Sequence, residues 1–327
     1  WNASDIMLIT YGDSFASEGR TTLDTLRVFL ASRLEGLIST VHILPFYPYT
    51  SDDGFAVSDY GTVDPNLGHW SDIHALRDCV DLMFDLPINH ASSAHVLFKN
   101  FLAGEADATQ YFLTAPAGTD ITQVMRPRTS DLLQTFLTAD GAKHVWCTFS
   151  RDQVDWDFRN PQVLCLFIDI VARYVQHGAT WLRLDAIAYL WKELGTNCIH
   201  LPQTHAIVKL LRLYGEALNP QTTILTETNV PNEENLSYFG NGDEAHVVYN
   251  FSLPPLLLHG LLTGQSKWLS EWCQALPDLP AGCTYLNFTA SHDGVGLRPA
   301  EGIIPQDELK AVFESMTAFG GLLTHRT

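Results

Sequence analysis

Residues 161–186 read PQVLCLFIDIVARYVQHGATWLRLDA. Apolar side chains recur at helical spacing over residues 161–177, and residues 180–184 form a short apolar run that ends in Arg183-Leu-Asp185-Ala186. A helix that leads into a strand, with charged side chains where the strand ends, is the repeating unit of a parallel α/β sheet. We therefore expect the same unit on both sides of this stretch.

Short apolar runs alternate with amphipathic stretches in both directions from this unit. Helices are expected at residues 27–34, 70–77, 161–177, 205–218 and 305–319. Strands are expected at residues 7–10, 38–44, 80–86, 180–184, 223–226, 247–251 and 284–288. This alternation predicts a parallel sheet of the (β/α)₈ barrel type, in the α/β class.

Two features interrupt the rhythm. Residues 91–157 are rich in Thr, Pro, Asp and Gly and lose the alternation, which predicts a subdomain inserted after the third strand. We accordingly divide the chain into a first barrel part (1–90), the insertion (91–157) and a second barrel part (158–327). A closed barrel needs an eighth strand, and none is found before Thr327. We expect the chain to stop short of that strand.

Composition limits the classes of partner. The 327 residues include 19 basic and 37 acidic side chains, a formal charge of −18 that repels nucleic acid and anionic membranes. No apolar run approaches the ~18 residues of a membrane span, and no signal peptide is visible, although the sequence starts with Trp1 rather than Met. None of the six cysteines forms a C-x-x-C pair, so we expect buried thiols in a reducing, cytoplasmic compartment.

Polar motifs follow four of the predicted strands. Any one of them alone is more often a helix cap or a solvated loop, but four in chain order, with two histidines and an arginine, favour a site. In a (β/α)₈ barrel the carboxyl ends of the strands carry the active site. The motifs are Asp85-Leu-Pro-Ile-Asn89-His90, Arg183-Leu-Asp185-Ala186, Thr226-Glu227-Thr228-Asn229 and Ser291-His292-Asp293-Gly294.

The residue types suit cleavage of a glycoside with retention of configuration. That chemistry needs two carboxyl groups about 5–5.5 Å apart, and Asp185 and Glu227 would lie on the adjacent fourth and fifth strands. Arg183 is two residues from Asp185, hence on the same face, where it can keep Asp185 ionised. Asp293 can stabilise a positively charged transition state. His90 and His292 can bind sugar hydroxyl groups, or they can be ordinary packed histidines.

Together the four motifs resemble the signature regions of the α-amylase superfamily, over essentially the whole chain. The resemblance implies that Asp185 is the nucleophile, Glu227 the general acid/base and Asp293 the transition-state stabiliser. It also implies a group of substrate-binding and supporting residues, namely Arg183, His90 and His292, with Asp85 and Asn89 in support.

Within that superfamily the chain looks most like the sucrose-phosphorylase branch. The segments at residues 8–13, 42–46 and 249–258 resemble that branch. In the loop Asp52-Asp53-Gly54-Phe55 the resemblance makes Asp52 a ligand of distal glucose hydroxyls and Phe55 an aromatic platform, whereas the residues alone fit an ordinary turn. Residues 126–128 and 145–149 resemble the inserted domain near the acceptor position. They make Phe149 a substrate contact and Arg126 and Arg128 candidate phosphate ligands, or else a solvated surface pair.

One departure bears on the substrate. After Glu227 the chain reads Thr-Asn-Val-Pro, where the sucrose enzymes carry Val-His, and this resembles the glucosylglycerate-phosphorylase subgroup. The resemblance implies a retaining α-glucoside phosphorylase that acts on a glucosylglycerate-like or sucrose-like donor and on inorganic phosphate, with no metal or cofactor. A hydrolase or transglucosidase would use the same carboxylates. A non-catalytic scaffold fits less well, since all three are present. The oligomeric state stays open.

Overall fold

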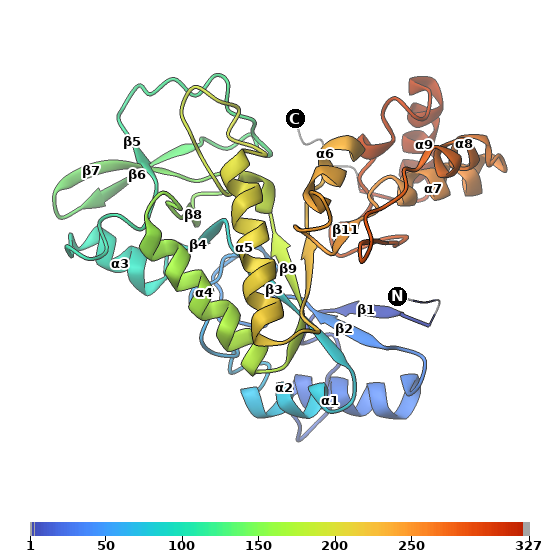
Figure 1. Cartoon of the computed structure of the whole chain (residues 1–327), viewed down its shortest axis with the longest axis horizontal. Helices are drawn as coiled ribbons and strands as arrows, with labels where there is room; N and C mark the ends of the chain where they lie inside the picture. The colour runs from blue at the N-terminus through green and yellow to red at the C-terminus, as the bar shows by residue number, and fades with distance from the viewer. Residues whose placement is uncertain (1, 3, 323–327) are drawn as a thin grey trace.

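A seven-stranded parallel sheet organises the molecule. We describe the chain from a computed structural model that covers residue 2 and residues 4–322 (Figure 1). The strands occur in the spatial order β1-β2-β3-β9-β10-β11-β12. Their bounds are β1 Met7–Thr10, β2 Thr40–Ile43, β3 Asp81–Pro87, β9 Ala179–Asp185, β10 Thr223–Thr226, β11 Val247–Tyr249 and β12 Thr284–Leu286. All seven predicted strands are thus confirmed, with ends that differ by a few residues.

The sheet is curled, and every neighbouring pair of strands is parallel. Strands β3 and β9 are adjacent although the inserted segment lies between them in the sequence. Strands β1 and β12 form the two edges, and no eighth strand joins the sheet in the part of the chain that the structure describes. The predicted (β/α)₈ architecture is confirmed as a seven-stranded part of a barrel.

Helices connect the strands and lie on the outside of the sheet (Figure 1). The longer ones are α1 Thr22–Phe29, α2 Trp70–Arg77, α4 Pro161–Gln176, α5 Pro202–Leu218, α7 Leu253–Thr263, α8 Lys267–Ala275 and α9 Gln306–Ala318. The short ones are η1 Leu30–Leu34, η2 Asp52–Gly54, η3 Ile187–Tyr189, α6 Asn232–Leu236, η4 Ser237–Phe239 and η5 Arg298–Ala300. Helix α1 begins earlier than predicted because the Thr21 hydroxyl caps it by accepting from the backbone N–H of Asp24.

Between β3 and α4 the chain forms helix α3 (Val96–Leu102) and two antiparallel sheets. One sheet pairs β4 (His90–Ser92) with β8 (Gln153–Asp155). The other has the order β5-β7-β6, with bounds β5 Thr114–Ala115, β6 Leu133–Thr138 and β7 Gly141–Trp146. Phe98 and Trp156 of this segment belong to the same buried cluster as Phe167 of α4. The inserted segment thus shares a buried cluster with the barrel helix α4. This packing does not test the division of the chain into three units at residues 90 and 157, which stays a prediction.

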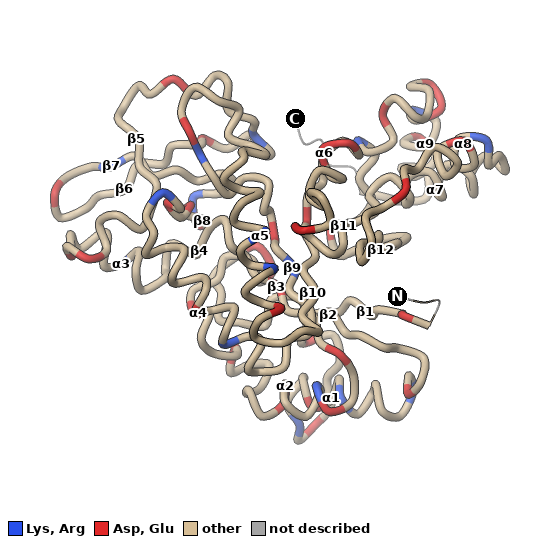
Figure 2. The backbone as a smooth tube through the Cα atoms, in the orientation of Figure 1, with Lys and Arg blue, Asp and Glu red and all other residues tan. Residues whose placement is uncertain are grey.

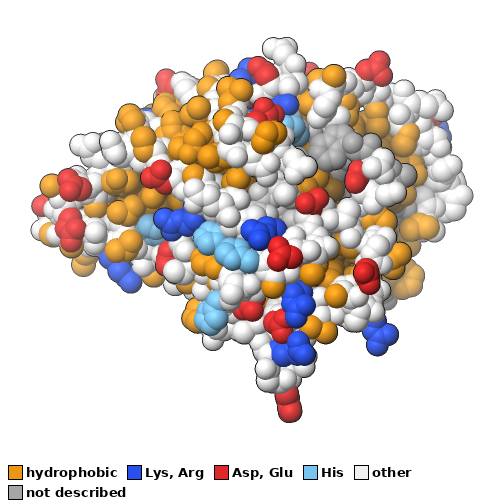
Figure 3. Space-filling view, turned by 60° about the horizontal axis from the view of Figure 1, so that its bottom comes forward, with side chains coloured by type: hydrophobic (Ala, Val, Ile, Leu, Met, Phe, Trp, Pro, Cys, Tyr) orange, Lys and Arg blue, Asp and Glu red, His pale blue; other side chains and the backbone are white. Residues whose placement is uncertain are grey.

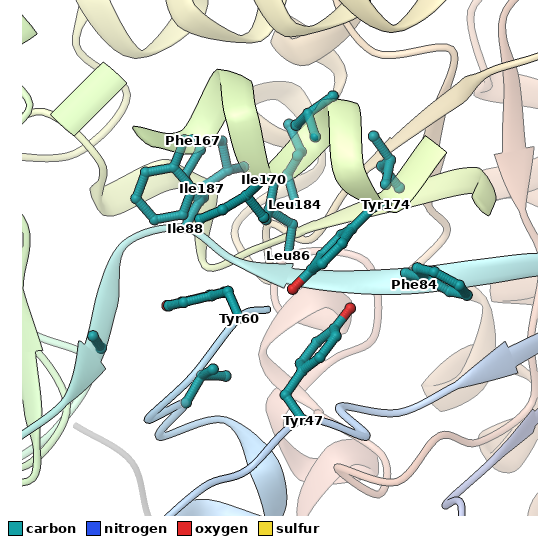
Figure 4. Close-up of a cluster of buried hydrophobic side chains, with 14 of the residues drawn as sticks. Tyr47, Tyr60, Phe84, Leu86, Ile88, Phe167, Ile170, Tyr174, Leu184 and Ile187 are labelled. Atoms are coloured by element: carbon teal, nitrogen blue, oxygen red, sulfur yellow. The ribbon is translucent and has the colours of Figure 1, made fainter. Parts of the chain in front are cut away.

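The core under the sheet joins α4 to β3 and to the segment after β2. Tyr47 and Tyr174 stack with ring centroids 5.1 Å apart, and their hydroxyl groups face each other in Figure 4. Phe84 meets the Tyr174 ring edge-on at 5.7 Å. Leu86 and Leu184, also drawn in Figure 4, are fully buried. This packing fixes the strands whose carboxyl ends carry the polar motifs.

The exposure of the cysteines differs from the prediction, and the charged residues are spread over the molecule. All six cysteines are free, but Cys79, Cys165 and Cys273 are exposed, so the expectation of buried thiols is wrong for half of them. Cys165 and Cys273 lie on solvent-facing sides of α4 and α8, where helical periodicity turns part of an apolar run outward. Basic and acidic residues both occur along the chain (Figure 2), and charged side chains of both signs are interspersed on the face in Figure 3. Residues 2 and 4–322 include no helix long and apolar enough to cross a membrane.

Candidate active site

Sheet order brings three of the four motifs to one place. Arg183 is in register with Asp85 on one neighbouring strand and with Leu225 on the other. Leu184 pairs with Thr226, so Asp185 and Glu227 follow at equivalent positions on adjacent strands. Neighbouring strands lie about 4.8 Å apart, so the two carboxyl groups extend from backbone positions that are close together.

Arg183 is the centre of a buried polar network. Its Nη1 atom donates to Asp185 Oδ1 at 2.7 Å and to Asp85 Oδ1 at 2.5 Å, and its Nε atom donates to the Tyr249 hydroxyl at 3.1 Å. The guanidinium group also lies 5.6 Å from the centre of the Phe55 ring. Arg183 is only 2% exposed, so these charge-assisted bonds act with little screening by water.

His42 completes the network from β2. Its Nε2 atom donates to Asp85 Oδ2 at 2.6 Å. Burial opposes ionisation of Asp85, but the charges of Arg183 and His42 outweigh it and lower the pKa of Asp85 to about 2. Asp85 therefore stays negative and holds Arg183 in place. His42 was visible in the sequence only as part of a strand, with no signal that it would meet Asp85.

Asp185 and Glu227 form a buried pair of carboxyl groups, and the positive charge of Arg183 acts to lower the pKa of both. Burial raises the pKa of Asp185 to about 8, Arg183 lowers it in part, and Glu227 raises it further. Burial likewise raises the pKa of Glu227, against the effect of Arg183. Arg183 bonds to Asp185 as expected, but burial and repulsion by Glu227 outweigh its effect on the pKa of Asp185. Near neutral pH the two carboxyl groups hold a proton between them.

The backbone after Asp185 is part of this arrangement. Ala186 has φ 50° and ψ 29°, in the left-handed region that residues with a side chain seldom adopt. In this conformation the backbone N–H of Ala186 donates to Glu227 Oε2 at 3.1 Å. The strained residue therefore links β9 to the second carboxyl group.

The fourth motif lies in a loop beyond the sheet, since β12 ends at Leu286, earlier than predicted. The His292 ring stacks on Phe55 with centroids 5.5 Å apart, and its Nδ1 atom is buried without a hydrogen-bond partner among the described residues. The Asp293 side chain is 54% exposed. Its charge contributes to the raised pKa of Glu227. Asp293 therefore lies within electrostatic reach of the pair, at the open side.

The loop after β2 meets the inserted segment beside these groups. The Gln153 amide donates to Asp52 Oδ2 at 2.7 Å and lies 3.1 Å from His90 Nε2. His90 Nε2 also lies 3.2 Å from the Phe55 carbonyl oxygen. Gln153 was missed in the sequence, although Gln153 and Asp155 alternate with apolar residues and so share one face of a short strand.

A buried lysine, Lys192, bonds to Asn89 and Asp155, which lie next to His90. Lys192 Nζ donates to Asn89 Oδ1 at 2.6 Å and pairs with Asp155 Oδ2 at 2.7 Å. Asp155 also accepts from the Asn89 amide at 3.2 Å and from the Thr148 backbone N–H at 3.0 Å. Asn89 thus has the contacts of a supporting residue. Lys192 was also missed, and its signal is a lone charge at the end of the apolar run 186–191.

The remaining predicted residues lie to one side of this group. Phe149 contacts His90 at a centroid distance of 5.2 Å and meets the ring of Tyr189 edge-on at 5.7 Å. The guanidinium carbon of Arg128 lies 6.0 Å from the centre of the Phe149 ring. The Nε and Nη2 atoms of Arg126 are buried without a hydrogen-bond partner among the described residues. Tyr189 had no role in the sequence analysis.

Comparison with known proteins identifies relatives of the chain. Residues 34–275 match the family model described as "Alpha amylase, catalytic domain". The chain is 48% identical to a glucosylglycerate phosphorylase of Spirochaeta thermophila, over 99% of this chain and 55% of that protein. It is 44% identical to a glucosylglycerate phosphorylase of Escherichia coli, over 99% of this chain and 58% of that protein. The chain therefore spans a little over half the length of these relatives.

A solved structure covers nearly the whole chain. The sucrose 6F-phosphate phosphorylase of Thermoanaerobacter thermosaccharolyticum superposes with a TM-score of 0.88 at 25% identity, over 99% of this chain and 66% of that one. A trehalulose synthase superposes with a TM-score of 0.67 at 18% identity, which shows a shared fold only. With the family model covering most of its length, this chain belongs to the family of α-amylase catalytic domains, in the sucrose-phosphorylase branch.

Proposed function

We propose that the protein transfers glucose between an α-glucoside and inorganic phosphate with retention of configuration. The observation that carries the proposal is the register of β9 and β10, which places Asp185 and Glu227 side by side with Arg183 bonded to Asp185. In this proposal Asp185 is the nucleophile, Glu227 the general acid/base and Asp293 the residue that stabilises positive charge in the transition state.

The first half-reaction uses the proton that the carboxyl pair holds. In the reactive form that we propose, the shared proton is on Glu227, and Asp185 is ionised with its charge stabilised by the direct hydrogen bond from Arg183. An Asp185 oxygen attacks C1 of the glucosyl group, the bond from C1 to the leaving oxygen breaks, and Glu227 gives its proton to that oxygen. The products are a glucosyl ester on Asp185 and the free acceptor.

The second half-reaction reverses these roles. A phosphate oxygen attacks C1, the ester bond to Asp185 breaks, and Glu227 takes up the proton that phosphate loses. Each step inverts the configuration at C1, so the product is α-glucose 1-phosphate.

The glucosyl group would lie over the buried residues. We propose Asp52, His90, Arg183 and His292 as ligands of its hydroxyl groups and Phe55 as an apolar contact, with Asp85 and Asn89 in support. Gln153 joins them because it already bonds to Asp52 and lies beside His90. The donor that we propose is a glucosylglycerate-like α-glucoside, because two relatives at 44–48% identity are named glucosylglycerate phosphorylases.

Phosphate must enter a site that carries three carboxyl groups, so cations have to offset their repulsion. We propose Arg128, beside Phe149, as a phosphate ligand, with Arg126 as a second candidate.

Sugar and phosphate are the partners in this proposal. The six free cysteines fit a reducing, cytoplasmic compartment.

The test compares glucosylglycerate and sucrose as donors, with and without inorganic phosphate, in the protein expressed from its complete gene. We expect α-glucose 1-phosphate as the main product from glucosylglycerate when phosphate is present. Formation of free glucose at the same rate in both conditions would replace the phosphorylase proposal with the hydrolase alternative, which uses the same carboxyl groups.

A further inference from the structure

Arg298 lies in the loop that carries the fourth motif, although it is not itself part of a motif. It opens η5, five residues after Asp293 in the loop that follows β12. Two residues earlier, Gly296 contacts the segment after β10. The amide nitrogen of Asn229 lies 3.5 Å from the position that a Cβ atom on Gly296 would take. Since Asn229 is two residues after Glu227, this loop lies over the Glu227 side of the site.

The backbone at Arg298 is firmly held although its side chain is exposed. The Ser252 hydroxyl donates to the carbonyl oxygen of Pro299 at 3.0 Å. Ala300 is fully buried in a cluster with Leu256 and Trp272. A side chain that starts from a fixed backbone loses less entropy on binding a ligand than one on a loose loop.

The guanidinium group of Arg298 has no ion pair or hydrogen bond among the residues that the structure describes. Arg128 likewise has no carboxylate partner among these residues. The positive charges of both arginines influence the pKa of Tyr189. Burial and the charge of Glu227 raise the pKa of Tyr189 to about 12, whereas Arg298 and Arg128 act to lower it. Arg128 reaches this region through Phe149, whose ring contacts Tyr189, and Arg298 lies within electrostatic reach of the same phenol.

We propose that Arg298 determines acceptor specificity by binding a carboxylate on the acceptor. The inference rests on the proposed function, in which Glu227 protonates the oxygen that leaves glucose. In a 2-hydroxy acid such as glycerate, the carboxylate is attached to the carbon that carries this oxygen, so it lies close to Glu227. A planar guanidinium group on that side matches a carboxylate with two parallel hydrogen bonds. Arg128, on the Phe149 side, stays available for phosphate.

The test uses Arg298→Ala, Arg298→Gln and Arg298→Lys in the protein expressed from its complete gene, with the exposed Arg33→Ala as matched control. Glucose is transferred from α-glucose 1-phosphate to D-glycerate and, separately, to the neutral acceptor glycerol. We expect the Ala and Gln variants to raise the KM for glycerate about tenfold or more, with little change for glycerol. The Lys variant should recover part of the loss, and Arg33→Ala should change neither value.

Two further measurements keep this inference separate from the proposed function. In cleavage of α-glucosyl fluoride, fluoride leaves and water takes up the glucosyl group, so no carboxylate acceptor takes part, and the reaction should proceed at the wild-type rate in the Gln variant. If the wild-type protein cleaves the fluoride but transfers glucose neither to glycerate nor to phosphate, the proposed function fails. Three results would overturn the role of Arg298: an unchanged KM for glycerate, an equal loss with glycerol, or a rise in the KM for phosphate alone.

Discussion

The floor and the rim of the candidate site are built differently. The floor consists of His42, Asp85, Arg183 and Asp185, all buried and joined by hydrogen bonds of 2.5–2.7 Å between residues on three strands. The rim consists of Arg128, Tyr189, Asp293 and Arg298, which lie on loops or short helical turns and are partly or fully exposed. Among the described residues, neither rim arginine has a carboxylate partner.

This difference separates two tasks. The floor fixes charges in a medium of low dielectric constant, where each bond supports the others and a lost partner leaves an uncompensated charge. The rim leaves its charges free for a ligand, and its backbone segments can change without disturbing the sheet. We therefore expect floor substitutions to affect chemistry or folding and rim substitutions to affect the choice of substrate.

The largest effect is expected at Asp185. Asp185→Ala should lower the rate of α-glucose 1-phosphate formation by about a thousandfold or more, roughly 4 kcal/mol in activation free energy, because covalent catalysis is lost. The fold should persist, since burial already disfavours the charged form of this carboxyl group. Circular dichroism of the variant checks folding. A variant that keeps more than about a hundredth of wild-type activity would contradict the assignment.

Asp85 should matter most for stability. Asp85→Ala removes a buried carboxylate that bonds to both Arg183 and His42, and its loss should lower the free energy of unfolding by about 3–5 kcal/mol. Asp293→Ala is the matched rim variant, and its unfolding free energy should change by less than about 0.5 kcal/mol. Urea denaturation of both variants measures the contrast. Equal losses of stability would remove the distinction between floor and rim.

A buried histidine outside the floor and the rim should make the stability of the fold depend on pH. His95 Nδ1 accepts from the Leu97 backbone N–H at 3.2 Å and caps α3, and burial lowers its pKa to about 4. In the unfolded chain the pKa returns to about 6.5. Between these values the unfolded state binds the proton and the folded state does not. Stability should therefore fall by up to about 3 kcal/mol as the pH decreases from 6.5 to 4.

His95→Asn is the test of this pH dependence. Asparagine also caps helices but does not titrate, so the loss of stability between pH 7 and pH 4.5, measured by urea denaturation, should be smaller in the variant. Other buried histidines will keep part of the slope. An identical slope in both proteins would show that protonation of His95 is not responsible.

Arg128 should give the smallest effect. Arg128→Ala removes a guanidinium group from the rim, and we expect the KM for phosphate to rise about tenfold, roughly 1.4 kcal/mol. Cleavage of α-glucosyl fluoride should change little, because that reaction leaves the phosphate position unused. Steady-state kinetics with the two substrates measures the split. A parallel loss in both reactions would place Arg128 with the floor.

Much of the floor could be predicted from the sequence. Arg183 and Asp185 are two residues apart on a strand, so their shared face follows from the period of the backbone. The order of strands and helices fixed the expectation of a parallel sheet, and its carboxyl edge gathers the motifs. The bonds of Asp85 to His42 and Arg183 join residues far apart in the chain, and only the sheet order brings them together.

The rest depends on contacts that leave no local pattern. Gln153 and Lys192 belong to no motif in the sequence, and their partners Asp52 and Asn89 lie about a hundred positions away in the chain. The sequence alone indicated which carboxyl groups to expect in the site, because the period of each strand and the succession of strands along the chain can be read from it. Tertiary structure alone decided how they share charge, since burial and distance set the pKa values. It also decided that the loop before Arg298 contacts Asn229, two residues after Glu227, because loops are placed by packing rather than by periodicity.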